Sequence, residues 1–134
     1  MTDMSGAASR EITGFEDLIA WQKARHLAKE IYTDTSKEAF SRDYGLKDQI
    51  RPAAVSVMPN VAEGFERGGR SDFHQFLVVA KSSCAEAKSQ LHVAADVGYL
   101  SEAEFNRLGS ATDEVSRITG GLRASAGRQR NSRK

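Results

Sequence analysis

Apolar residues recur at spacings of three and four along most of the chain, which is the period of an α-helix with one buried face. No segment alternates strictly between apolar and polar residues over a useful length, so strands are not predicted. The pattern predicts four helices, at about 15–36, 44–66, 71–97 and 101–122. The expected fold class is therefore all-α, with the helices packed as a single bundle.

Several positions mark where these helices should begin and end. Thr13 with Glu16, and Ser101 with Glu104, have the Ser/Thr-x-x-Glu spacing of a capping box. Gly98 is expected to end the third helix. The residues expected to face the core from the first helix are Leu18, Trp21, Ala24, Ala28, Ile31, Tyr32 and Thr35.

The second predicted helix is apolar over more than half of its circumference. Val55, Met58 and Ala62 point away from its main apolar face, so this helix must be covered on more than one side. In a chain this short, some of that cover is expected from another subunit. Val55, Met58 and Ala62 are therefore the candidate oligomer interface.

The same helix carries polar residues and prolines that need a structural explanation. Gln49, Asn60 and Glu63 lie on its narrow polar strip and are expected to fix the register of the helix through hydrogen bonds. Pro52 and Pro59 each remove a backbone hydrogen bond, so kinks are expected there.

Length and composition fit one domain of 134 residues that buries its own core. The single cysteine, Cys84, excludes an intramolecular disulfide and a multi-cysteine zinc site, and it is expected to be a buried packing thiol. No apolar run could span a membrane and no secretory signal is recognisable, so a cytoplasmic location is expected. The expected organisation is a flexible arm at 1–12, the bundle at 13–122 and a disordered basic tail at 123–134.

Charge is distributed unevenly, although the net charge is only +1. Six of the 19 basic residues, and none of the 18 acidic ones, follow Glu114. A mildly acidic body with a basic end is a pattern typical of nucleic-acid contact. The six residues are Arg117, Arg123, Arg128, Arg130, Arg133 and Lys134.

A second basic group lies on one side of the third predicted helix, where Arg70, His74, Lys81, Lys88 and His92 recur at helical spacing. The plain interpretation is a solvated face. The sharper interpretation is a row of phosphate contacts that an oligomer repeats by symmetry. No aromatic residue interleaves the row, so stacking of single-stranded bases on it is not indicated.

The stretch "GFERGGRS" (64–71) differs by one residue from the phosphate-loop pattern G-x-x-x-x-G-K-[ST]. A phosphate loop follows a buried strand, whereas Gly64 here ends a helical pattern. Arg70 also lacks the geometry of the usual lysine. We therefore expect a helix-to-helix reversal, in which Gly64 lets helices approach and Gly68 and Gly69 permit the turn. A weak anion site near Arg67 and Arg70 is compatible with this interpretation.

Catalysis and metal binding find little support in the sequence. No Glu is followed by His three residues later, so the paired motif of di-iron bundles is absent. His26, His74 and His92 are not clustered with acids at metal-ligand spacing and are expected to lie on the surface or on helix flanks. No catalytic residue, metal or cofactor is assigned.

Four segments together resemble the four-helix bundle protein family, also called the 23S rRNA intervening-sequence protein family. They are "FEDLIAWQKARHLAKEIY", "YGLKDQIRPAAVSVMPNVAEGFERGG", "DFHQFLVVAKSSCAEAKSQL" and "GYLSEAEF". The resemblance implies an up-and-down four-helix bundle that assembles as a ring-shaped homopentamer, and it implies nucleic-acid binding. The accessory proteins of diversity-generating retroelements are similar in fold and work with RNA and a reverse transcriptase.

The chain departs from the family pattern in its second helix. The family's segment resembles "QIRRAAVSIPSNIAEG", whereas this chain has Pro52 in place of the second arginine and has its next proline one place later, at Pro59. The first change removes a basic group beside Arg51, so nucleic-acid binding is not carried over to that position.

The resulting hypothesis is a non-catalytic, homo-oligomeric accessory protein that binds RNA or DNA through backbone charge. The alternative is a protein-interaction scaffold, for example an accessory to a reverse transcriptase or ribonucleoprotein, without direct nucleic-acid contact. The candidate nucleic-acid-binding residues are Arg70, Lys81, Lys88, Arg123, Arg128, Arg130, Arg133 and Lys134.

Overall fold

The computed structural model describes the backbone of residues 12–132 and the side chains of residues 12–124. Within that part the chain is helical and contains no strand. The elements are η1 (Phe15–Asp17), α2 (Ile19–Thr35), α3 (Glu38–Arg42), α4 (Tyr44–Arg67), α5 (Arg70–Asp96) and α6 (Glu102–Ser132). The prediction of an all-α chain with four long helices is confirmed.

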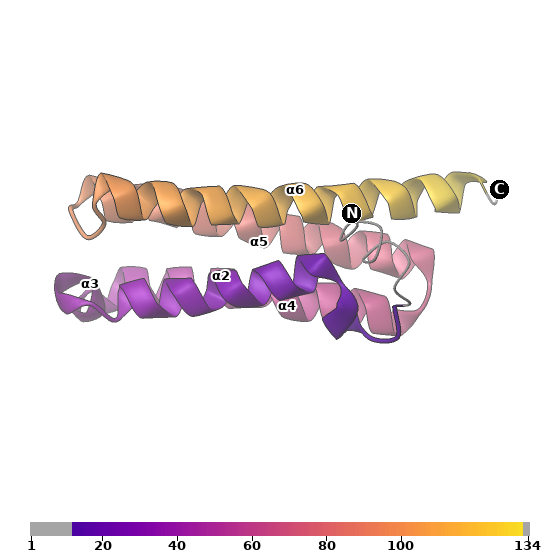
Figure 1. Ribbon diagram of the computed structural model, residues 1–134, viewed down its shortest axis with the longest axis horizontal. Helices are drawn as coiled ribbons and strands as arrows, with labels where there is room; N and C mark the ends of the chain where they lie inside the picture. The colour runs from indigo at the N-terminus through magenta and orange to yellow at the C-terminus, as the bar shows by residue number, and fades with distance from the viewer. Residues whose placement is uncertain (1–11, 133–134) are drawn as a thin grey trace, which may run out of the picture.

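The four long helices lie side by side along the long axis of the molecule (Figure 1). Each packs against the helix that follows it in the chain, α2 on α4, α4 on α5 and α5 on α6, and α2 also packs on α6 to close the bundle. Successive neighbours joined by short turns run in opposite directions, which is the up-and-down arrangement. The contact between α2 and α6 is the least extensive of the four.

The core is built from residues at the helical spacings that the sequence shows. Buried aliphatic and small side chains from all four long helices form one cluster, whose largest fully buried members include Leu27, Ile31, Ile50, Leu77, Leu91 and Leu108. Cys84 lies inside this cluster with 1% of its surface exposed, which confirms the prediction of a packing thiol. Thr112 and Thr119 of α6 are also fully buried.

The predicted start of the first helix is wrong by four residues. Phe15–Asp17 forms a separate turn, Leu18 is extended, and α2 begins at Ile19. The Thr13 and Glu16 capping box does not form. Instead, the Asp17 carboxylate accepts hydrogen bonds from the backbone N–H groups of Thr13 at 2.9 Å and Gly14 at 3.1 Å. A carboxylate one residue further on thus takes the capping role.

The capping box predicted at Ser101 and the helix end predicted at Gly98 are confirmed. Ser101 N–H donates to Glu104 Oε1 at 2.8 Å, and Glu104 N–H donates to Ser101 Oγ at 3.1 Å, which is a complete capping box. Gly98 has φ 87° and ends α5. Its turn is closed by a bond from Tyr99 N–H to the Ala94 carbonyl at 2.9 Å.

The short helix α3 (Glu38–Arg42) was not predicted. It places Phe40, 2% exposed, over one end of the core, where its ring stacks on Tyr99 at 5.1 Å between centroids. Asp43 adds to this contact. Its carboxylate caps α4 by accepting a hydrogen bond from the N–H of Leu46 at 3.0 Å, and it accepts another from the Tyr99 hydroxyl at 2.9 Å. Both bonds favour the charged carboxylate and lower the pKa of Asp43.

The C-terminal helix extends further than predicted. α6 does not end near Leu122 but continues to Ser132, so the expected disordered tail is helical in its backbone as far as that residue. Thr119 and Leu122 pack on the core just before this extension. Once a helix is anchored in this way, each added residue needs no new nucleation, and Gly120 and Gly121 cost only about 1 kcal/mol each.

Candidate nucleic-acid interface

Lys81 and Lys88 of the basic row on α5 lie in the seam between α5 and α6. Lys81 Nζ donates to Ser116 Oγ at 2.8 Å, and Lys88 Nζ pairs with Asp113 Oδ1 at 2.8 Å. The Lys81 stem also lies over Gly120, where an added Cβ would be 3.6 Å from Lys81 Cε. The two lysines therefore join the helices, and a phosphate on Lys88 would compete with a carboxylate.

The glycines of α6 make that seam possible. A Cβ at Gly109 would lie 3.4 Å from Lys88 Cε, just as Gly120 receives Lys81. At the end of the row, the exposed ring of His92 contacts Phe105, with 4.9 Å between centroids. His74 is half-buried, and its Nδ1 has no hydrogen-bond partner in the described part of the chain.

The C-terminal basic residues lie along and beyond the end of α6. Arg117 is exposed, and Arg123 is half-buried with its Nε unpaired among the described residues. Arg128 and Arg130 fall on the helical backbone of α6, in the stretch whose side chains are not described. Arg133 and Lys134 lie outside the described residues. Figure 1 shows this stretch of α6 continuing past the turn that joins α4 to α5.

The segment "GFERGGRS" forms the turn between α4 and α5, as predicted. Gly68 adopts φ 79° and Gly69 precedes α5, so the chain reverses within two residues. A Cβ on Gly64 would lie 2.8 Å from Phe76 Cβ, which confirms that this glycine lets the helices approach. Arg67 pairs with Glu63 at 3.1 Å and lies over the Phe76 ring. A helix rather than a strand precedes the turn, so the frame of a phosphate loop is not formed.

The predicted polar network on α4 forms differently. Asn60 Nδ2 donates to the Ser56 carbonyl within its own helix at 2.7 Å, Glu63 pairs with Arg67, and Gln49 is exposed. The polar contact across the α4–α5 seam is instead a hydrogen bond from Ser56 Oγ to Ser83 Oγ at 2.7 Å.

The candidate interface residues lie on the side of α4 that turns toward α2. Met58 is half-buried and packs against the core of its own chain. Ala62 is half-buried, and Val55 is 36% exposed. Part of the cover expected from another subunit thus comes from the same chain.

A larger surface with little charge lies on the outer side of α5. The exposed residues there recur at spacings of three and four and are small, polar or aliphatic: Gln75, Val78, Val79, Ser82, Ala85, Ser89 and Val93. Val79 and Val93 are 49% and 48% exposed. The one charged residue among these exposed positions is Glu86, four residues after Ser82 and three before Ser89. We call the seven residues and Glu86 the α5 outer face.

Cations also gather where α2 meets α4, a group that the sequence did not reveal. Tyr32 was expected in the core but is 44% exposed, because Ile31 and Thr35 occupy the core-facing positions of this turn of α2. The Arg51 guanidinium lies over the Tyr32 ring, 4.2 Å from its centroid. Further along α2, the Arg25 guanidinium lies 5.5 Å from the centroid of Trp21.

Metal and nucleophile chemistry find no site in the described residues. No group of three or more His, Cys, Asp and Glu side chains among them could hold a metal ion. Burial raises the pKa of Cys84 to about 11, so its thiol is protonated at neutral pH. His26 is an exposed partner of Glu30 at 2.7 Å. None of the helices in the described part is long and apolar enough to cross a bilayer.

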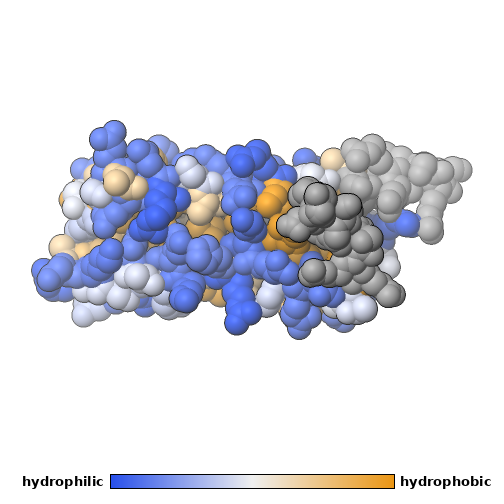
Figure 2. Space-filling model, in the orientation of Figure 1, coloured by the Kyte–Doolittle hydropathy of each residue, from blue (hydrophilic) through white to orange (hydrophobic). Residues whose placement is uncertain are grey.

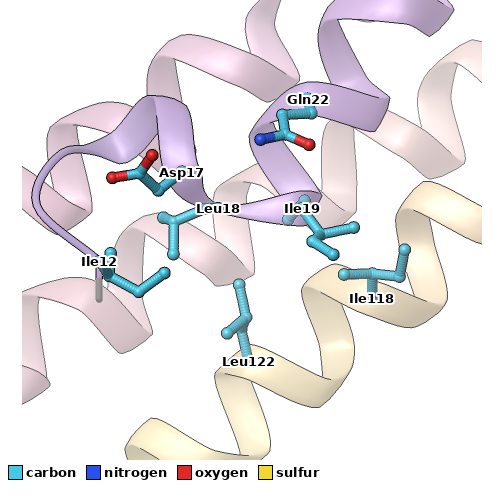
Figure 3. Close-up of a pocket in the computed structure, with 8 residues that line it drawn as sticks. Ile12, Asp17, Leu18, Ile19, Gln22, Ile118 and Leu122 are labelled. Atoms are coloured by element: carbon cyan, nitrogen blue, oxygen red, sulfur yellow. The ribbon is translucent and has the colours of Figure 1, made fainter. Parts of the chain in front are cut away.

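A pocket of about 240 Å³ opens between the start of α2 and the later part of α6. Leu18, Ile19, Ile118 and Leu122 point into it, and Asp17 and Gln22 lie at its rim (Figure 3). The visible face of the molecule is mostly hydrophilic, and apolar residues show along the seam between α2 and α6 (Figure 2). The pocket lacks converging acid–base groups.

Comparison with known proteins agrees with this architecture. Residues 16–121 match the family described as 23S rRNA-intervening sequence protein. The structure is similar to the crystal structure of a protein with unknown function from the S23 ribosomal protein family of Bacteroides thetaiotaomicron. The TM-score is 0.72 at 18% identity, over 78% of this chain and 98% of that one, so the likeness concerns the fold. No curated protein matches the sequence.

Proposed function

Because the chain belongs to the 23S rRNA-intervening sequence protein family, we propose that it is a non-catalytic, oligomeric accessory protein that binds RNA through the phosphate backbone. The observation that carries the proposal is the C-terminal half of α6. Four basic residues and no acidic one follow Glu114 in α6, which continues to Ser132, and Arg133 and Lys134 follow the helix in the sequence.

A helix that carries cations beyond the bundle suits backbone binding. From Arg117 to Arg130 the axis rises about 20 Å, at about 1.5 Å per residue. Contacts of this kind depend on charge and not on base sequence, and each releases counterions. The α5 row adds less, because Lys81 and Lys88 already have partners on α6.

Assembly is supported by the α5 outer face. A solvated helix face usually carries several charges, whereas this one carries only Glu86 along five turns and exposes Val78, Val79 and Val93. A second copy is a fitting cover, and a ring of five subunits, the assembly that the family resemblance implies, would gather five α6 ends on one particle. Val55 remains the alternative contact.

Charge-removing variants test RNA binding. The variant combines Arg128→Gln, Arg130→Gln, Arg133→Gln and Lys134→Gln, and its matched control replaces the three arginines with lysine. On single-stranded RNA, losing four phosphate contacts should flatten the slope of log affinity against log salt by about 3. The lysine control should keep the slope.

Two results would contradict the proposal. If the glutamine variant binds a structured RNA with unchanged affinity and slope, the end of α6 is a solvated helix. If the wild type binds no RNA even at low salt, the scaffold alternative is correct. Light scattering tests assembly, with an expected mass several times 14.6 kDa. Val79→Glu should lower that mass and Val55→Glu should not.

A further inference from the structure

We propose that the exposed face where α2 meets α4 is a stacking site for unpaired RNA bases, centred on Tyr32 and Arg51. The inference rests on the proposed RNA binding and adds to it a second, base-contacting surface. Backbone charge alone does not distinguish paired from unpaired RNA, whereas a stacking site takes only bases that are free of a duplex.

The centre of the site is the Tyr32 ring with the Arg51 guanidinium over it. Arg51 Nε donates to Thr35 Oγ1 at 2.8 Å, and Arg51 Nη2 donates to Ser36 Oγ at 3.0 Å. These bonds fix the guanidinium at 4.2 Å from the Tyr32 ring centroid. The tyrosine remains 44% exposed, so a flat, preorganised surface faces solvent. Bases stack on tyrosine rings and on arginine planes alike.

Positive charge lies on the α2 side of this platform, whereas Asp48 of α4 is exposed one turn before Arg51. Arg25 and Lys29 precede Tyr32 by seven and three residues, which places all three on one side of α2, and both cations are exposed. The acids of α2 lie on the other side. Glu30 and Asp34 turn toward α6, where Arg107 pairs with them at 2.9 and 2.7 Å. The Tyr32 side of α2 therefore attracts phosphates that flank a stacked base.

The charge also argues against a second copy as the occupant. A protein interface buries its centre, and lysine is depleted there because an unpaired buried charge is costly. Arg25 and Lys29 lie beside Tyr32, whereas the α5 outer face offers a surface for assembly with one charged residue, Glu86. RNA instead brings its own negative charge to each cation.

The test compares a labelled oligoadenylate with an abasic strand of equal length and with a duplex, by fluorescence anisotropy on the full chain. Tyr32→Leu should weaken oligoadenylate binding roughly tenfold, and binding to the abasic strand and the duplex should stay within about twofold. Tyr32→Phe should restore the affinity. Tyr44→Leu is the matched control, because Tyr44 is 66% exposed and also has a cation, Lys47, at 4.7 Å.

The salt dependence separates stacking from charge. Tyr32→Leu should leave the salt slope unchanged, whereas Lys29→Gln should flatten it by about 0.7. Equal affinity of Tyr32→Leu and wild type for oligoadenylate would overturn the inference and leave backbone binding standing. Equal losses on the abasic strand, or with Tyr44→Leu, would also overturn it. A drop in particle mass with Tyr32→Leu would make this face a contact between copies. Absence of all RNA binding would overturn both proposals.

Discussion

Replacing Gly64 with alanine would add a methyl group where α4 and α5 are in contact. The new Cβ would lie 2.8 Å from Phe76 Cβ and 3.1 Å from Phe73 Cδ1. Phe76 Cβ is fixed to the backbone of α5, so rotating a side chain does not relieve the contact and the helices must move apart. Overpacking of this kind costs about 1–3 kcal/mol.

The same substitution also has a favourable part, since alanine is a better helix former than glycine by about 1 kcal/mol. Gly121→Ala isolates that part. Gly121 is exposed inside α6, and an added Cβ there meets nothing within 4 Å. We therefore expect Gly121→Ala to stabilise the chain by about 1 kcal/mol and Gly64→Ala to be less stable than Gly121→Ala by about 1–3 kcal/mol.

Urea unfolding followed by circular dichroism measures both variants against the wild type. If the two variants gain the same stability, the close approach of α4 and α5 at Gly64 is not real, and the account of the "GFERGGRS" turn fails with it. If Gly64→Ala is less stable than Gly121→Ala and the oligomer mass is unchanged, the loss of stability comes from the contact of α4 with α5 at this turn.

Two further predictions concern charge. The lowered pKa of Asp43 means that its contribution to stability is complete above the unfolded value near about 3.9 and is lost as pH falls through the lower folded value. Asp43→Asn should therefore weaken acid dependence in melts between about pH 5 and pH 2, and an unchanged dependence would refute the Asp43–Leu46 cap as its source. Arg107→Met removes the 2.7 Å partner of Asp34, which is 3% exposed, and leaves only Lys37 at 3.2 Å, so it should cost about 1–3 kcal/mol. Lys23→Met breaks an exposed pair and should cost less than about 1 kcal/mol; equal losses in urea would contradict the distinction.

The helix pattern was readable from the sequence because burial follows a fixed period. α4 ends one residue after the predicted end, and α5 begins and ends one residue before the predicted positions. Glycine turns and the Ser101 capping box mark these ends chemically. The first helix carried a weaker signal, since Thr13 and Asp17 can cap in more than one register.

The extent of α6 was harder to predict, because a segment without apolar residues can still form a helix when it continues one that is already packed. Arginine, alanine and glutamine after Leu122 are good helix formers, yet the lack of apolar residues there was interpreted as disorder. An anchored helix continues without a buried face of its own.

The candidate site depends on register between helices, which periodicity along a single helix does not contain. Lys81 and Lys88 do lie on one side of α5, as their spacing indicates, but the short turn after Asp96 sets α6 so that Ser116 and Asp113 face them. Two cations of α5 that could have faced solvent therefore form contacts between helices.

The pair of Tyr32 and Arg51 is likewise a contact between helices that the sequence did not show, but here it remains exposed. Its ring belongs to α2 and its guanidinium to α4, nineteen residues apart. The spacing of residues along a single helix therefore does not show that the two side chains meet. The arginine at position 51 was set aside because Pro52 removes its basic neighbour. In the fold, Thr35 and Ser36 orient Arg51 instead, and the proposed stacking site depends on this preorganisation, which lowers the cost of binding.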